Sequence, residues 1–272
     1  GNPPPLPDHV RFSPDGKMVA FLAPFEIPND PQPGEVPPQC LCVAKVKDTN
    51  SLMVGVAARS FAWSPDGRDI AYTNYPDPKK LVAEHGMVNV KPSNRTVVKV
   101  LKLPPDQYIT DWHPDGKHFL TTRQWPKAGL VLVSLDGKEQ KPLTDPEKLF
   151  AVQGRFSPDG SKVLCLRVTP PKKGEEGPAK QELMVLELNT GKTTLVTDVP
   201  PADALAYAWS PDGKRIAYTW REKHAGKPEE VTAKETESRL VTCNPDGGNK
   251  TVLMKEKGKG QWHATLMGVD WR

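Results

Sequence analysis

The chain lacks the features that mark membrane proteins and several common enzyme classes. None of its apolar runs approaches the roughly 18 residues of a membrane span, so no span is expected. It contains no Gly-x-Ser-x-Gly nucleophile elbow, no phosphate-binding glycine loop and no His-Glu-x-x-His zinc signature. These absences argue against the hydrolases, nucleotide-binding enzymes and zinc proteases that carry such motifs.

An excess of charge of one sign is also absent. The 37 basic and 33 acidic residues leave a net charge of +4, and charged clusters such as residues 172–176 and 221–237 mix both signs. Alternating charges of this kind are typical of a solvated loop. A nucleic-acid partner is therefore not expected.

Only four cysteines occur among the 272 residues. Cys40 and Cys42 lie two apart on a predicted strand, where they share a face but are awkward to bridge, and Cys165 and Cys243 lie in different repeats. We expect all four to be reduced packing residues. They do not decide the compartment.

Histidine is scarce and scattered, with six in the chain. His113 and His118 flank one turn and could in principle bind a metal together with Asp115, but ordinary turn and strand roles are favoured. The structural role of the turn aspartates likewise accounts for them without a cation. We therefore predict no catalytic residue, no metal ligand and no cofactor.

What the chain does contain is a recurrent motif in which an aromatic residue precedes a Pro-Asp-Gly turn and a short apolar strand. The five copies are Phe12–Gly16, Trp63–Gly67, Trp112–Gly116, Phe156–Gly160 and Trp209–Gly213. Their aspartates lie 44 to 53 residues apart, a period typical of propellers and solenoids. The chain is therefore predicted to be a repeat protein.

Each motif predicts a tight turn between two antiparallel strands. Proline presets the φ of the second turn position, aspartate accepts a local hydrogen bond, and glycine supplies a positive φ. A second hairpin follows in every repeat, for example residues 183–196 around Asn189-Thr190-Gly191. Two hairpins make a four-stranded antiparallel blade. The predicted repeats are approximately 10–57, 60–103, 107–145, 152–198 and 204–256.

The predicted fold is all-β, a single β-propeller domain over residues 1–272 with five blades preferred and six possible. A sixth Pro-Asp-Gly at 245–247 lacks the aromatic and is interpreted as an outer hairpin turn. Residues 265–272 resemble an innermost strand and are expected to close the ring, supplementing or displacing the strand around residues 10–12. An open solenoid is disfavoured because no polar capping repeat is present.

The pattern aromatic-Ser-Pro-Asp-Gly-Lys-x-Ile-Ala-Tyr, clearest at residues 63–72 and 209–218, resembles the TolB-type propeller repeat, a relative of the WD-type repeat. The resemblance spans nearly the whole chain and implies the fold. It leaves function open, since the family includes periplasmic assembly proteins, sensor domains and the propellers of prolyl oligopeptidase-like enzymes. The third copy departs from the pattern with His113 in place of serine, which should leave the turn intact.

The chain begins Gly-Asn-Pro-Pro-Pro, and we expect that a preceding segment has been removed. A signal peptide there would place the protein outside the cytoplasm. Together with the TolB-type resemblance, this favours a periplasmic or secreted location over a cytoplasmic one.

Long loops are expected on one face of the disc, opposite the Pro-Asp-Gly turns, and long loops on a rigid scaffold often bind partners. The predicted loops there are 24–39, 75–86, 124–129, 169–181 and 221–238. The candidate partner-binding residues are Tyr75, Trp125, Lys172, Lys173, Trp220, Arg221 and His224. For Tyr75 and Trp220, sealing of the strand ends is an equal alternative.

The predicted function is that of a non-catalytic propeller scaffold that binds a protein or peptide through this loop-rich face. One alternative is a small-ligand, metal-binding or enzymatic propeller that uses the axial channel, where the inner strands converge. Another is an accessory domain of a larger enzyme or sensor. The oligomeric state is not predicted.

Overall fold

The computed structural model describes residues 10–24, 39–77, 80, 82–90, 97–124, 126–171, 179–199, 206–221, 235–259 and 269–271. These residues form strands and turns and contain no helix, so none of them could cross a membrane as a helical span. The described part of the chain is all-β, as predicted.

The strands form five four-stranded antiparallel sheets in which neighbours in sequence are neighbours in space. The first sheet contains β1 (Val10–Phe12), β2 (Met18–Pro24), β3 (Gln39–Lys45) and β4 (Asp48–Ala57). The second contains β5 (Ser60–Trp63), β6 (Asp69–Asn74), β7 (Glu84–Asn89) and β8 (Val97–Leu101). The third contains β9 (Gln107–Trp112), β10 (His118–Arg123), β11 (Gly129–Ser134) and β12 (Gln140–Pro142).

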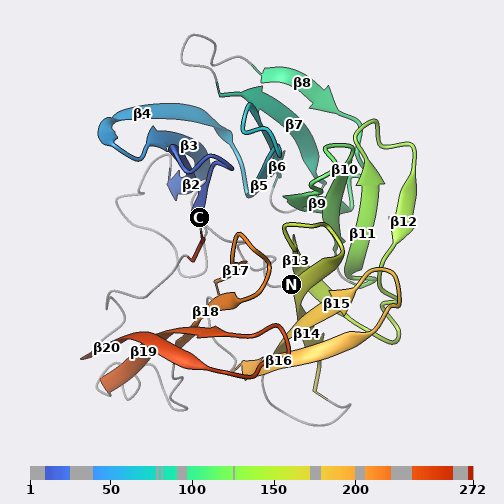
Figure 1. Ribbon diagram of the computed structural model, residues 1–272. Coiled ribbons are helices and arrows are strands. Elements are labelled where there is room, and N and C mark those ends of the chain that lie inside the picture. The colour runs from blue at the N-terminus through green and yellow to red at the C-terminus, as the bar shows by residue number, and fades with distance from the viewer. Residues whose placement is uncertain are drawn as a thin grey trace.

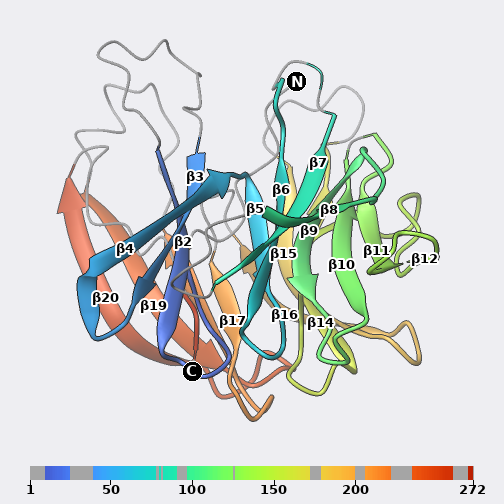
Figure 2. The same cartoon turned by 90° about the horizontal axis from the view of Figure 1, so that it is seen from above.

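The fourth sheet contains β13 (Ala151–Phe156), β14 (Lys162–Thr169), β15 (Lys180–Glu187) and β16 (Thr193–Val199), and the fifth contains β17 (Tyr207–Trp209), β18 (Ile216–Arg221), β19 (Glu235–Cys243) and β20 (Thr251–Lys259). Figure 1 shows the sheets arranged around a common centre, and Figure 2 shows the same ring turned by a quarter. The molecule is a five-bladed β-propeller, and each sheet is one blade, numbered in chain order.

The Pro-Asp-Gly turns have the geometry that their sequence predicts. In blade two, Gly67 N donates to Ser64 O at 2.9 Å, and Gly67 has a φ of 70°. The Ser64 hydroxyl donates to Asp66 Oδ1 at 2.7 Å and accepts the Asp69 amide at 2.9 Å. The serine thus joins the turn to the next strand, and Ser13, Ser157 and Ser210 make the same pair of bonds.

His113 preserves the third turn by a different set of bonds. Gly116 N still donates to His113 O at 2.9 Å, and the Asp115 amide donates to His113 Nδ1 at 3.1 Å. His113 Nε2 lies 3.3 Å from Gly160 O, in the turn of the next blade. The histidine therefore replaces serine without loss of the turn and also contacts a neighbouring blade.

The Pro-Asp-Gly at 245–247 is the outer hairpin turn between β19 and β20, as predicted. Gly247 has a φ of 79°, and its amide donates to Asn244 O at 2.9 Å. The same turn chemistry therefore serves both inner and outer hairpins. The inner turns differ from this outer turn by the preceding aromatic and by serine or histidine in place of Asn244.

The apolar core is divided among the interfaces between consecutive blades. One buried cluster joins blades one and two, another blades two and three, and two more join blades three to five. The four cysteines are buried and free, as expected, and burial raises the pKa of the Cys165 thiol to about 12. Their role is packing.

The expected closing segment 265–272 lies mostly outside the described residues, and its described part, 269–271, is not in a strand. β1 pairs with β2 in the innermost position of blade one. Val269 and Trp271 pack against Ala206, Ala208 and Ala217 of blade five. β1 therefore keeps the innermost position of blade one, and residues 269–271 pack beside blade five.

Candidate functional site

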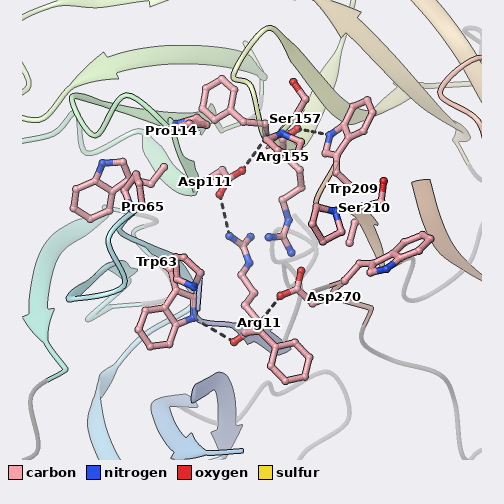
Figure 3. A pocket seen from close by; sticks show the side chains of 18 of the residues that line it. Arg11, Trp63, Pro65, Asp111, Pro114, Arg155, Ser157, Trp209, Ser210 and Asp270 are labelled. Atoms are coloured by element: carbon pink, nitrogen blue, oxygen red, sulfur yellow. Dashed lines mark hydrogen bonds and ion pairs between the residues drawn. The ribbon is translucent and has the colours of Figure 1, made fainter. Parts of the chain in front are cut away.

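A cavity of about 240 Å³ lies on the propeller axis, at the end where the Pro-Asp-Gly turns are found. Side chains from the innermost strands and turns of all five blades line it, together with Asp270 and Trp271 (Figure 3). The five turn prolines form part of its wall: Pro14, Pro65, Pro114, Pro158 and Pro211. The turns that build the blades thus also build this cavity.

The residue directly before each innermost aromatic follows a repeating order around the axis. In chain order these residues are Arg11, Ala62, Asp111, Arg155, Ala208 and Asp270. The triplet Arg-Ala-Asp therefore occurs twice around the ring. All of these residues except Ala62 line the cavity.

The two aspartates are each bonded to the backbone of the next innermost segment. Asp111 Oδ2 accepts the Phe156 amide at 2.8 Å, and Asp270 Oδ2 accepts the Phe12 amide at 2.7 Å. Asp270 thus accepts a backbone amide of the innermost strand of blade one, just as Asp111 accepts one of blade four. Part of the acceptor capacity of each carboxylate is used in positioning strands.

The two arginines are buried and direct their guanidinium groups toward the axis (Figure 3). Arg11 Nη2 donates to Thr110 O at 2.7 Å, and Nη1 lies 3.4 Å from Asp111 Oδ1. The Arg11 guanidinium also lies 5.5 Å from the centre of the Phe61 ring. Arg155 is 9% exposed, and its carbonyl accepts the indole N–H of Trp209 at 3.2 Å.

The cavity lining combines apolar, polar and charged side chains. Its lining includes tryptophan, phenylalanine, proline and serine side chains besides the charged ones, and it contains no histidine or cysteine. Within the described ranges, no three His, Cys, Asp or Glu side chains form a group that could bind a metal ion. The lining is unusual in containing two buried arginines, Arg11 and Arg155.

The aspartates of the turns serve as fixed acceptors. The hydrogen bond from Ser157 lowers the pKa of Asp159 to about 2, and Ser64 similarly lowers the pKa of Asp66. Such carboxylates stay ionised near neutral pH and are poorly placed to act as general acids. Their role in the structure is to stabilise the turns.

His113, His118 and Asp115 lie together, as their spacing suggested. His118 Nδ1 lies 2.8 Å from Asp115 Oδ2, and His113 Nδ1 lies 3.1 Å from Asp115 Oδ1. The Asp115 carboxylate also accepts the Lys117 amide at 2.7 Å. These contacts fit within ordinary turn hydrogen bonding.

Two of the candidate partner-binding residues have described side chains. Tyr75 is 7% exposed, packs with Ala83 and Tyr108, and accepts a hydrogen bond from Gln124 Nε2 at 3.1 Å. Trp220 is half-buried against the core of blades four and five, and the Arg239 guanidinium lies 4.8 Å from its ring centre. Tyr75 thus seals a strand end, whereas Trp220 and Arg239 form a partly exposed pair.

The side chains of the remaining candidates are outside the described part of the chain. Trp125, Lys172, Lys173 and His224 lie outside the described residues, and of Arg221 only the backbone, the last residue of β18, is described. The predicted loop 221–238 is shorter than expected, because β19 already begins at Glu235. Tyr75 and Trp220, the two candidates with described side chains, are not among the residues that line the cavity.

The axial residues Arg11, Asp111, Arg155 and Asp270 were not singled out from the sequence. A signal was present, because each directly precedes an innermost aromatic. Its meaning depends on the closure of the ring, which places these positions around one axis.

No protein-family model and no curated protein sequence matches this chain. Solved structures do. TolB from Acinetobacter baumannii is 20% identical with a TM-score of 0.65, and the match covers 93% of this chain and 55% of that one. A putative TolB from Agrobacterium tumefaciens is 18% identical with a TM-score of 0.62, and the match covers 98% of this chain and 86% of that one. This chain thus spans only about half the length of the Acinetobacter protein.

An enzyme has a similar fold as well. The oligogalacturonate lyase from Vibrio parahaemolyticus is 13% identical with a TM-score of 0.52, and the match covers 92% of this chain and 66% of the lyase. At such identities the likeness concerns the fold and leaves activity open. The chain is a five-bladed, TolB-like β-propeller.

Proposed function

We propose that this propeller is a non-catalytic module that binds a protein or peptide partner. The observation that carries the proposal is the axial cavity, which combines aromatic rings with two buried arginines. Aromatic and arginine side chains are favoured anchors at interfaces. The volume of about 240 Å³ is smaller than the ~300–1,000 Å³ of small-molecule pockets. It suits one side chain or chain end of a larger partner.

The loop-rich face is the second surface that we propose for the same function. Trp220 and Arg239 support it, because an aromatic ring and a guanidinium are already stacked there with the Arg239 side chain 38% exposed. The candidates Tyr75, Trp125, Lys172, Lys173, Arg221 and His224 belong to the same proposal. The two surfaces can be separated by experiment.

We also infer a periplasmic or secreted location. The TolB-like fold supports it, because the resemblance is to a family that includes periplasmic assembly proteins. Fractionation of the source cells, with the protein detected by antibody, tests this inference.

The function is tested by selecting peptides from a displayed random library against the full chain. Two variants then locate the bound peptide. Pro158→Cys places a thiol at the mouth of the cavity, and Pro245→Cys places one in the outer Pro-Asp-Gly turn, away from the axis. The four native cysteines are buried, so a bulky maleimide should label only the new thiol.

We expect selected peptides to bind with dissociation constants below about 100 µM and to lose at least about tenfold in affinity when position 158 is labelled. Labelling of position 245 should leave the affinity unchanged. If neither label matters but replacing residues 222–234 by a short turn abolishes binding, the loop-rich face is the site. Failure to select any binding peptide would contradict the proposed function.

A further inference from the structure

A buried histidine connects blade two to blade three through a chain of three hydrogen bonds. The Ile109 amide of β9 donates to Thr73 Oγ1 at 3.0 Å, and Thr73 Oγ1 lies 3.0 Å from His85 Nδ1. His85 Nε2 in turn lies 3.1 Å from the carbonyl oxygen of Pro104. Pro104 belongs to residues 102–106, which join β8 to β9 and are called the blade link below. His85 therefore bonds both to the link and, through Thr73, to the next blade.

The partners determine where the protons of this chain lie. A carbonyl oxygen can only accept, so Nε2 carries the ring proton of neutral His85. Nδ1 then accepts the hydroxyl proton of Thr73, and the hydroxyl oxygen accepts the N–H of Ile109. A second ring proton, on Nδ1, would take away the acceptor of the Thr73 hydroxyl. The chain of bonds therefore requires a neutral histidine.

The side chains that surround His85 are uncharged. His85 is 5% exposed, and in the register of blade two it lies in one row with Ser60 of β5, Thr73 of β6 and Leu101 of β8. Two tyrosines belong to the elements that supply Thr73 and Ile109. Burial raises the pKa of Tyr75, which follows β6, and raises that of Tyr108 in β9 to about 12. Both tyrosines therefore stay neutral in mild acid.

The charged residues of the neighbouring elements do not pair with His85. Glu84 precedes it in β7, but adjacent residues of a strand point to opposite faces, and burial together with the Glu84 charge raises the pKa of Tyr72. Asp106 of the blade link lies 3.4 Å from an arginine of β10. Arg59, just before β5, has a charge of the same sign as a protonated histidine. A proton on His85 would thus be a buried charge without a counter-ion, which is costly.

The titration of His85 follows from this environment. Burial lowers the pKa of His85 below the ordinary 6.5, and the Pro104 carbonyl offsets part of this effect. The unfolded chain therefore binds a proton at a pH where the folded protein does not. The stability that neutral His85 supports is complete above about pH 6.5, and it is lost as the pH falls below that value toward the lower pKa of the folded state.

We propose that His85 is an acid-sensitive switch whose protonation releases the blade link and the Ile109 amide, and so loosens the contact between blades two and three. The adjoining bond of the link is the one from Ala83 N to Pro105 O, at 2.8 Å. Ala83 also packs against Tyr75, so release of the link should reach the strand end that Tyr75 seals. The switch does not depend on the proposed function.

The next interface contains a matched contact without a titratable group. Thr122 has the same place relative to its Pro-Asp-Gly turn as Thr73, and its Oγ1 accepts the amide of Gln153 in blade four at 3.2 Å. The residue paired with Thr122 on the next strand is Leu130, whereas Thr73 is paired with His85. Mild acid should therefore act on the amide held by Thr73 and not on the one held by Thr122.

Hydrogen exchange of the wild-type protein between pH 7.5 and pH 5.0, corrected for the intrinsic rate, tests this difference. We expect the Ile109 amide to lose about five- to thirtyfold in protection at pH 5.0, the range that a lowered histidine pKa permits. The Gln153 amide should change by less than about twofold. NMR of the histidine rings should show His85 neutral with its proton on Nε2 at pH 7.5, and titrating only below pH 6.5.

Two variants separate His85 from general effects of acid. Glutamine can donate to Pro104 and accept from Thr73 but cannot become charged, so His85→Gln should keep Ile109 protected at pH 5.0. His118→Gln removes a different histidine, which is bonded to Asp115 in an inner turn, and should keep the wild-type acid response.

Equal loss of protection at Ile109 and Gln153 would overturn the switch, because it would indicate a general acid destabilisation. An undiminished acid response in His85→Gln, or a His85 ring that is already charged at pH 7, would also overturn it. Should His85→Gln fail to fold, the two wild-type amides and the ring titration still decide the question.

Discussion

At the scale of single residues, glycine is required in the turns for two reasons: a positive φ and, at some positions, the lack of space for a Cβ atom. Gly137 and Gly191 both lie in outer hairpin turns, with φ of 75° and 69°. A Cβ at Gly191 would meet no atom within 4 Å, whereas at Gly137 it would lie 1.9 Å from the carbonyl oxygen of Lys102, in blade two. Gly191 is needed for its backbone conformation alone. Gly137 is needed also because a neighbouring blade occupies the space.

This difference predicts unequal costs for the same substitution. Gly191→Ala should reduce the free energy of unfolding by about 1–2 kcal/mol, the strain of an L-residue in the left-handed region. Gly137→Ala adds a backbone collision between blades and should cost roughly 1–3 kcal/mol more. Thermal or urea unfolding of the two variants measures this. Equal losses would show that the contact between Gly137 and Lys102 does not constrain the blades.

At the scale of elements, the last residue of an innermost strand ties one blade to the previous one. The indole N–H of Trp63 donates to Arg11 O, and that of Trp209 donates to Arg155 O, both at 3.2 Å. Trp112 has the same place in β9, but its buried indole nitrogen has no hydrogen-bond partner among the described residues. The tryptophan that ends the innermost strand thus forms an indole hydrogen bond to the previous blade in blades two and five, and in blade three it contributes packing alone.

Replacing Trp209 or Trp112 by phenylalanine distinguishes the contribution of the indole hydrogen bond from that of apolar packing. Trp209→Phe removes a bond and leaves the Arg155 carbonyl without this donor, while Trp112→Phe removes an unsatisfied N–H. Since both changes delete similar apolar volume, Trp209→Phe should cost about 1–2 kcal/mol more. Midpoints of chemical denaturation compare the two variants. A larger loss for Trp112→Phe would argue that packing, not the indole bond, connects the blades.

At the scale of the whole molecule, residues 269–271 connect the last blade to the first. Val269 and Trp271 pack on blade five, and the Asp270 carboxylate accepts the amide of Phe12 in blade one. The equivalent bond from Phe156 to Asp111 joins blades three and four within the ring. One type of contact is therefore used both between consecutive blades and between the two ends of the described ring.

Hydrogen exchange can test this connection at single amides. Asp270→Ala should speed exchange of the Phe12 amide by roughly tenfold or more, because the bond that protects it is lost, and should leave Phe156 unchanged. Asp111→Ala is the matched control and should do the reverse. Unchanged protection of Phe12 in Asp270→Ala would show that β1 is fixed by its pairing with β2 alone.

The sequence by itself determined the blades, because their information is local. Proline, aspartate and glycine encode each turn within a few residues, and alternating apolar residues encode the strands beside it, so the hairpins of β9 and β10 or β19 and β20 could be predicted. The same locality identified 245–247 as an outer turn.

Only the tertiary structure decided which residues share a site. Arg11, Asp111, Arg155 and Asp270 belong to different repeats, and they meet because the innermost strands converge on one axis when the ring forms. Nothing in a single repeat encodes that convergence, since it is a property of the ring. Loop length is a property of the chain and predicts a binding face by itself, whereas the axial cavity and the burial of its two arginines exist only in the folded ring.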